Sequence, residues 1–229
     1  MAKGNGVRFP LYLLASALLM TGCSSSGTVS NLEHNEASAA TTPMVEAASA
    51  GELDEVRSLA EDGASLNTLT EHGTPLAAAV TGQRDDVALY LLQQGAEPDR
   101  TGPDGVTPLM QAAASGQRRM VSLLLAAGAD VNARASNGAS PVMMAAQQGH
   151  LSVVKMLLSA GANVNISQEG ESLLMQIVER GDLLTAEVLV SAGADVDYRA
   201  EDGRTALDVA RNNNNRELEM LLVQAGADI

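Results

Sequence analysis

Residue types that commonly carry chemistry are sparse in this chain. Its 229 residues include three histidines, His34, His72 and His150, and a single cysteine, Cys23. A histidine that acts as a general base needs a nucleophile or an acid–base partner within hydrogen-bond reach. The three histidines occupy mutually distant positions, and one cysteine cannot form an internal disulfide. Acid–base catalysis by these residues is therefore not expected.

Other catalytic and ligand-binding motifs are also missing from the sequence. We find no nucleophile elbow, phosphate-binding loop, glycine-rich dinucleotide turn or paired His/Cys metal set. The carboxylates are abundant but follow no acid–base pattern, so we interpret them as solvated. The formal net charge is −14, which disfavours nucleic acid. We expect a protein that is not an enzyme, with no cofactor, no metal and no nucleic-acid partner.

A repeated pattern organises most of the chain. In the segment 107–132, Thr-Pro and an apolar run predict a capped helix start, and a second helix with Val121, Leu124 and Leu125 on one face follows. Equivalent Thr or Ser residues recur at steps of 32 or 33 residues, at Thr42, Thr74, Thr107, Ser140, Ser172 and Thr205. A Gly-Ala series has the same step, beginning at Gly63, Gly95, Gly128, Gly161, Gly193 and Gly226.

This pattern resembles the ankyrin repeat, a unit of about 33 residues with a turn and two antiparallel helices. The resemblance implies an all-α solenoid of about six helix-turn-helix repeats with short β-turn or hairpin fingers, and a binding function rather than catalysis. The expected repeats are 42–73, 74–106, 107–139, 140–171, 172–204 and 205–229. The fifth repeat has Ile177-Val178 where others have an alanine pair, so we expect the most irregular junction there.

The N-terminus has a different character. Lys3 and Arg8 precede the apolar stretch 9–20, as in a signal peptide, and the segment 19–23, Leu-Met-Thr-Gly-Cys, resembles the lipobox of bacterial lipoproteins. That resemblance implies cleavage after Gly22 and lipidation of Cys23, and Ser24 then favours the outer membrane, facing the periplasm. The alternative is an ordinary signal peptide with an incidental cysteine. Residues 23–41, after the leader 1–22, are interpreted as the lipidated cysteine and a flexible tether.

Charge and methionine content suggest where a partner binds. Segments 42–104 and 169–229 have net charges of −9 and −8, and 105–168 has +3, a pattern suited to steering a basic protein surface. Met110, Met143 and Met175 take equivalent positions in consecutive repeats; they are either core filling or an adaptable contact patch.

The ankyrin resemblance places finger tips and inner helices on the concave binding face. The candidate contact residues are Glu71, His72, Asp104, Met110, Gln111, Ser136, Asn137, Met143, Gln147, Gln148, Met175, Glu179, Arg180, Glu201, Asp202 and Arg204.

Three functions are compatible with such a module, which we expect to be monomeric when free and to touch the membrane only through its lipid. The favoured hypothesis is an inhibitor or immunity protein that binds a toxic or secreted enzyme. The second is a non-inhibitory scaffold for a periplasmic or envelope enzyme, and the third is a surface-displayed protein that binds host proteins. A fold does not identify the partner.

Overall fold

The computed structural model describes residues 42–228. Twelve helices occur in this range, two for each of the six expected repeats. The first helices of the repeats are α1 (Pro43–Ala50), α3 (Pro75–Thr81), α5 (Pro108–Ala114), α7 (Pro141–Gln147), α9 (Leu173–Glu179) and α11 (Ala206–Asn212). The second helices are α2 (Leu53–Glu61), α4 (Asp85–Gln93), α6 (Arg118–Ala126), α8 (Leu151–Ser159), α10 (Leu183–Ser191) and α12 (Arg216–Gln224). The leader, Cys23 and the tether lie outside the described residues.

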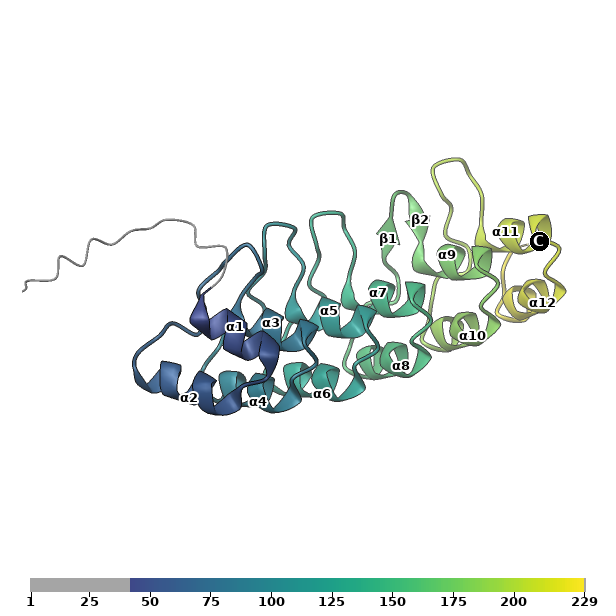
Figure 1. The fold of residues 1–229 in the computed structure, drawn as a ribbon. Helices are drawn as coiled ribbons and strands as arrows, with labels where there is room; N and C mark the ends of the chain where they lie inside the picture. The colour runs from purple at the N-terminus through teal and green to yellow at the C-terminus, as the bar shows by residue number, and fades with distance from the viewer. Residues whose placement is uncertain (1–41, 229) are drawn as a thin grey trace, which may run out of the picture. The chain divides into compact units, whose positions relative to one another are not determined.

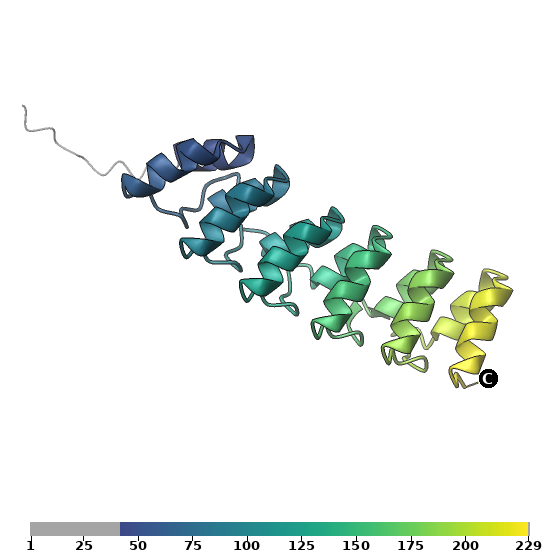
Figure 2. The ribbon, with the colours of Figure 1, turned by 90° about the horizontal axis from the view of Figure 1, so that it is seen from below.

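The two kinds of helix form two layers within the described repeats. Figure 1 shows the first helices side by side in one layer, with the connecting loops rising above it and the second helices below. Figure 2 shows the second-helix layer from the opposite side. Each repeat buries its apolar surface against its neighbours, and the buried side chains form one continuous core from Met44 to Ala227. Stacking of this kind is how solenoid repeats become stable.

The Thr and Ser series marks helix starts because each hydroxyl caps a helix. Thr107 Oγ1, for example, accepts the N–H of Met110 at 3.2 Å. The same bond occurs in all six repeats, including at Ser172, where no proline follows. The predicted caps are confirmed. They fix where each first helix begins and therefore which of its residues face the neighbouring repeats.

The loops between repeats are the predicted fingers. One of them contains paired strands, β1 (Ser167–Gln168) and β2 (Glu171–Ser172), joined by Glu169 and Gly170. Both turn residues have positive φ, 55° and 82°, as the type I′ turn of a two-residue hairpin loop requires. In another finger a single bridge links Thr70 and Gly73.

Two series of side-chain hydrogen bonds join successive repeats. In the first, which we call the exit-loop ladder, an Asn or Asp oxygen accepts an N–H from the next repeat. The pairs are Asn67 with Glu97 (2.9 Å), Asp99 with Asp130 (3.0 Å), Asn132 with Asn163 (2.7 Å), Asn165 with Asp195 (2.8 Å) and Asp197 with Asp228 (2.9 Å). The ladder satisfies backbone N–H groups in loops that have no sheet partner.

The second series, the turn ladder, starts at the bend between the two helices of a repeat. A side chain at this bend bonds the carbonyl at the end of the preceding first helix. The pairs are Arg84 with Ser49 (3.1 Å), Gln117 with Val80 (3.1 Å), His150 with Ala114 (3.1 Å) and Asn213 with Glu179 (3.4 Å).

The fifth repeat departs from the turn ladder. Asp182 stands at its bend, and its carboxylate caps α10 by accepting the N–H and the hydroxyl of Thr185 at 3.1 and 2.6 Å. The backbones of α7 and α9 also approach less closely than those of α5 and α7, because Ile177 and Val178 are bulkier than an alanine pair. Both side chains are fully buried, so the expected irregularity is a wider spacing rather than an exposed core.

Candidate functional site

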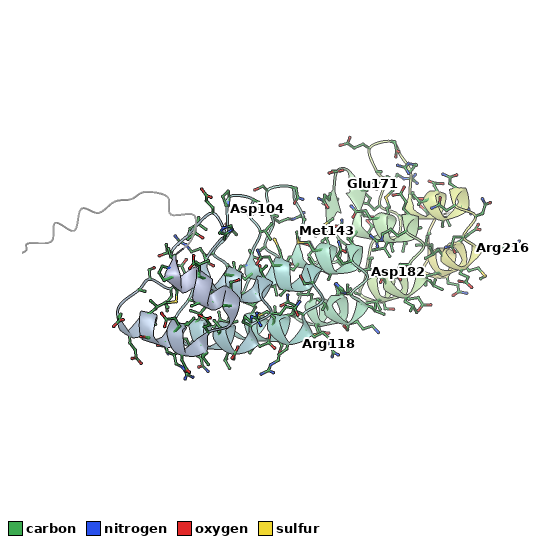
Figure 3. The ribbon with its side chains drawn as sticks, viewed as in Figure 1. Asp104, Arg118, Met143, Glu171, Asp182 and Arg216 are labelled. Atoms are coloured by element: carbon green, nitrogen blue, oxygen red, sulfur yellow. The ribbon has the colours of Figure 1, made fainter. Side chains whose placement is uncertain are left out.

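The side of the stack that carries the fingers is the candidate binding surface, and we call it the loop face. It consists of the finger tips and the exposed positions of the first helices. Figure 3 shows Asp104 and Glu171 on this side and Arg118 on the side of the second helices. Most of the predicted contact residues are at least partly exposed there. These are Glu71, His72, Asp104, Gln111, Ser136, Asn137, Gln147, Gln148, Glu179, Arg180, Glu201, Asp202 and Arg204.

The methionine stripe does not belong to this surface. Met110, Met143 and Met175 are 0 %, 0 % and 1 % exposed, so the contact-patch interpretation is wrong and the core-filling interpretation is correct. These residues lie three positions after the capping residue, where the side chain points between layers. The exposed row lies one residue later, because each helical residue turns the side chain by about 100°.

The exposed row consists of the side chains that follow the methionine position in the first helices. Its members are Glu46, Gln111, Met144 and Gln176, whereas the equivalent Ala78 of α3 is buried. Three positions further along their helices lie Ser49, Thr81, Ala114, Gln147 and Glu179. Three hollows lie along this row. We number them from the N-terminal side of the chain.

The first hollow lies over α1 and α3 and has a volume of about 520 Å³. Its lining is mainly apolar, and His72 borders it from a finger. The lining residues are Val45, Glu46, Ser49, Ala50, His72, Ala78 and Thr81. A hollow of this composition can accept an apolar or aromatic side chain, the usual anchor of a protein interface.

The second hollow, of about 320 Å³, lies over α5. It is lined by Thr81, Val106, Gln111, Ala114, Ser115, Gln117 and Met144. The side-chain oxygens of Gln111 and Gln117 are buried, and no described group donates a hydrogen bond to either. An unsatisfied buried acceptor costs about 1–3 kcal/mol. A donor brought by a partner would offset this cost once the amide turned toward it.

The third hollow, of about 420 Å³, lies beneath the β1–β2 finger. All five lining side chains are amides or carboxylates: Gln147, Gln168, Glu169, Glu171 and Gln176. Gln147 Nε2 donates to Gln176 Oε1 at 3.0 Å and to Gln168 Oε1 at 3.4 Å. Gln168 Nε2 donates to the Asn137 carbonyl at 3.2 Å. Because the donors of Gln147 and Gln168 are used within the protein, the groups left for a partner are chiefly acceptors.

The carboxylates of the third hollow differ in their pairing. Arg204 bonds Glu171 Oε1 at 3.1 Å and also bonds Asp202. The Arg204 guanidinium lowers the pKa of Asp202 below its usual value, first through a side-chain hydrogen bond. No group in the described part of the chain pairs with Glu169. Arg204 is therefore engaged within the protein, and Glu169 is the carboxylate open to a partner's cation.

Within 42–228 no group of three or more His, Cys, Asp or Glu side chains is placed to hold a metal ion. In the same range no helix has the length and apolar character to cross a bilayer.

Known proteins agree with this architecture. The family model for ankyrin repeats (three copies) matches residues 16–102 and 97–168, and no curated protein matches the chain. The crystal structure of an ankyrin repeat domain from Acinetobacter baumannii is similar with a TM-score of 0.77 and 27% identity, over 81% of this chain and 98% of that one. The ankyrin repeat domain of Bcl-3, a member of the IkappaB protein family, has the same TM-score and identity, over 82% and 87%.

Ankyrin repeat domains are generally protein-binding modules, and a stack whose exposed hollows differ in chemistry fits that role. The family match covers more than half of the 229 residues, and the twelve helices form six repeats of the expected kind. The chain belongs to the ankyrin-repeat family.

Proposed function

We propose that this chain binds one protein partner through the loop face and inhibits it, as an immunity protein bound to a toxic or secreted enzyme. The third hollow is the observation that carries the binding proposal. Its acceptors and the unpaired Glu169 favour an arginine or lysine side chain, since charge-assisted hydrogen bonds are stronger than neutral ones. The first and second hollows then take an apolar group and a hydrogen-bond donor from the same partner.

Inhibition is favoured over scaffolding because of how the surface is built. Three hollows of different chemistry suit one irregular protein surface better than a repetitive ligand. A close fit at several anchors gives the tight binding that neutralisation needs, about nanomolar or better, whereas a scaffold functions at about micromolar affinity.

Location at the periplasmic side of the outer membrane is the second part of the proposal. It is supported by the leader-like segment 1–22, by Cys23 in a lipobox-like context and by Ser24. Metabolic labelling with a fatty acid tests it: the chain should be labelled and sediment with outer membranes. Cys23→Ala should abolish the label, and labelling that survives this change would refute the anchor.

Capture of the partner tests the inhibitory role. A soluble chain starting at residue 24 would be used to recover partners from periplasmic and envelope extract, at low and at physiological salt. We expect one stoichiometric enzyme that is inactive in the complex. Recovery of an enzyme that stays active, or of a structural envelope protein, would replace inhibition by the scaffold function.

A matched pair of variants tests the binding surface. Glu169→Gln removes one charge from the third hollow and should weaken the complex by about tenfold, or about 1.4 kcal/mol. Glu61→Gln makes the same chemical change at the exposed end of α2 and should leave affinity unchanged. Equal effects of the two variants, measured by calorimetry, would exclude the third hollow as the contact site.

A further inference from the structure

A further depression lies on the side of the described repeats away from the loop face. It runs between α6 and α8 in the second-helix layer, has a volume of about 560 Å³, and we call it the outer groove. Its lining residues are Arg118, Ser122, Leu125, Ser152, Lys155, Met156, Ser159 and Ala160. Figure 2 shows these neighbouring helices from their exposed side, and in Figure 3 Arg118 lies opposite Asp104 and Glu171.

The outer groove is basic in a strongly acidic chain. Helices α5 to α8 contain no Asp or Glu, although the chain as a whole has 28 acidic residues against 14 basic ones. The neighbouring Arg119 pairs with Asp85 at 3.4 Å. Arg118 and Lys155, by contrast, form no ion pair with any group in residues 42–228, so their charges remain open to a partner.

The floor between these cations is apolar. Leu125 and Met156 are half-buried and line the groove with Ala160. Exposed Ser122 and Ser152 add hydroxyl groups at its sides. A ligand that fits must therefore combine an apolar group with negative charge.

We propose that the outer groove docks an acidic amphipathic segment of a second protein. One apolar side chain of the segment lies over Leu125 and Met156, and flanking carboxylates face Arg118 and Lys155. This surface is separate from the loop face, so it would let the chain hold a further protein while the loop face is occupied. It goes beyond the proposed inhibition and does not depend on it.

The charges of the flanking helices select a narrow segment over a broad anionic surface. Asp85 and Asp86 lie on α4, and Glu187 lies on α10, on either side of the α6–α8 pair. An anionic membrane that covered the groove would also approach these carboxylates, and like charges repel. A single segment laid along the groove avoids them.

Synthetic peptides provide the test. The probe is a 16-residue helical peptide with a leucine stripe flanked by glutamates, with fluorescence anisotropy as the readout. The protein is the chain from residue 24, which retains all of the described repeats, residues 42–228. We expect saturable binding that weakens by about tenfold or more when the peptide's glutamates are replaced by glutamines, and that falls at high salt.

Charge reversal separates the groove from general electrostatics. Arg118→Glu with Lys155→Glu should weaken binding of the glutamate peptide by about tenfold or more. The same variant should bind a peptide in which lysines replace the glutamates. Arg216→Glu with Arg57→Glu reverses two exposed cations elsewhere in the second-helix layer, on α12 and α2, and should change neither result. All four side chains are exposed, and circular dichroism would confirm that both variants are folded.

Three outcomes would overturn the proposal. They are the absence of saturable binding, equal binding of the glutamate and glutamine peptides, and equal loss in the two double variants. Sedimentation with phosphatidylglycerol vesicles but not with phosphatidylcholine vesicles, in the absence of peptide binding, would assign the groove to a membrane. Because the loop face is untouched, these results are independent of partner capture and of the Glu169→Gln comparison.

Discussion

Met143 and Met144 are adjacent in the chain but have different surroundings. Met143 is fully buried in the core, whereas Met144 is partly exposed and lines the second hollow. One residue of a helix thus separates a side chain that stabilises the stack from one that can contact a partner. The repeat pattern predicted the helix correctly, but the contact row was assigned one position too early.

The two methionines allow a direct test of this difference. Met143→Ala should lower the free energy of unfolding by about 2–5 kcal/mol, because it removes buried atoms and leaves a cavity. Met144→Ala should cost less than about 1 kcal/mol but should weaken partner binding. Urea unfolding and calorimetry of both variants would measure this, and a larger stability loss in Met144→Ala would contradict the assignment.

Asp208 gives the last repeat a pH-dependent cap. Its Oδ2 accepts the N–H and the hydroxyl of Thr205 at 2.9 and 3.0 Å, and these bonds hold its pKa below the usual value. A depressed pKa stabilises the folded state above the unfolded pKa of about 3.9, and this contribution is lost as pH falls through the lower folded value.

Asparagine at this position isolates the effect of the charge. Asp208→Asn should lower stability at pH 7 by about 0.5 kcal/mol, with allowance for solvent screening of an exposed group. The difference between wild type and variant should begin to shrink as pH falls below about 4, and it should disappear only below the lowered folded pKa, where the wild-type carboxyl is protonated in both states. Urea unfolding at several pH values measures it, and a difference independent of pH would refute the role of the charge.

At the scale of elements, the inter-repeat hydrogen bonds were not anticipated from the sequence. The carboxylates were interpreted as solvated, whereas the exit-loop Asn and Asp side chains bond partners about 30 residues away. Their recurrence at the repeat period, as in Asn132 and Asn165, is the signal that could have revealed the exit-loop ladder. His150 has a structural role in the turn ladder, and its ring packs so closely on Gly116 that an added Cβ would lie 2.7 Å from it.

Asn132 tests the exit-loop ladder because its side chain both accepts a hydrogen bond from the next repeat and donates one to it. Its Oδ1 accepts the Asn163 N–H at 2.7 Å, and its Nδ2 donates to the Gly161 carbonyl at 3.1 Å. Asn132→Ala should cost about 1–3 kcal/mol, since each lost bond contributes about 0.5–1.5 kcal/mol. Asn132→Asp keeps the acceptor and should cost less, as measured by urea unfolding; the reverse order would contradict the ladder.

At the scale of the whole described stack, the hollows of the loop face depend on how neighbouring repeats meet. The sequence alone indicates the fold because period, caps and apolar faces are local or repeated. A hollow such as the third one arises from glutamines and glutamates of different repeats, and their mutual approach is not written in either repeat alone. Gln147 was predicted as a contact residue, whereas Gln168, Glu169, Glu171 and Gln176 were not.

Charge at this scale should control the rate of partner association. The two acidic ends of the repeat region, with net charges of −9 and −8, should attract a basic surface over distances longer than a contact. The association rate constant should fall by about tenfold or more between 20 mM and 0.5 M salt, while dissociation changes less. Stopped-flow or surface-based kinetics would measure both, and a salt-independent association rate would refute steering.

The missing turn-ladder bond at Asp182 has a mechanical consequence. The junction between α7 and α9 is wider than that between α5 and α7, and glutamine amides bridge it on the loop face. We expect the stack to deform more easily at this junction than at its neighbours, because the backbones are less closely packed there and one bond of the turn ladder is missing. A cation held in the third hollow would contact residues on both sides of the junction and hold them together, so amide hydrogen exchange around the junction should slow when the partner binds, and should do so well beyond the contact itself.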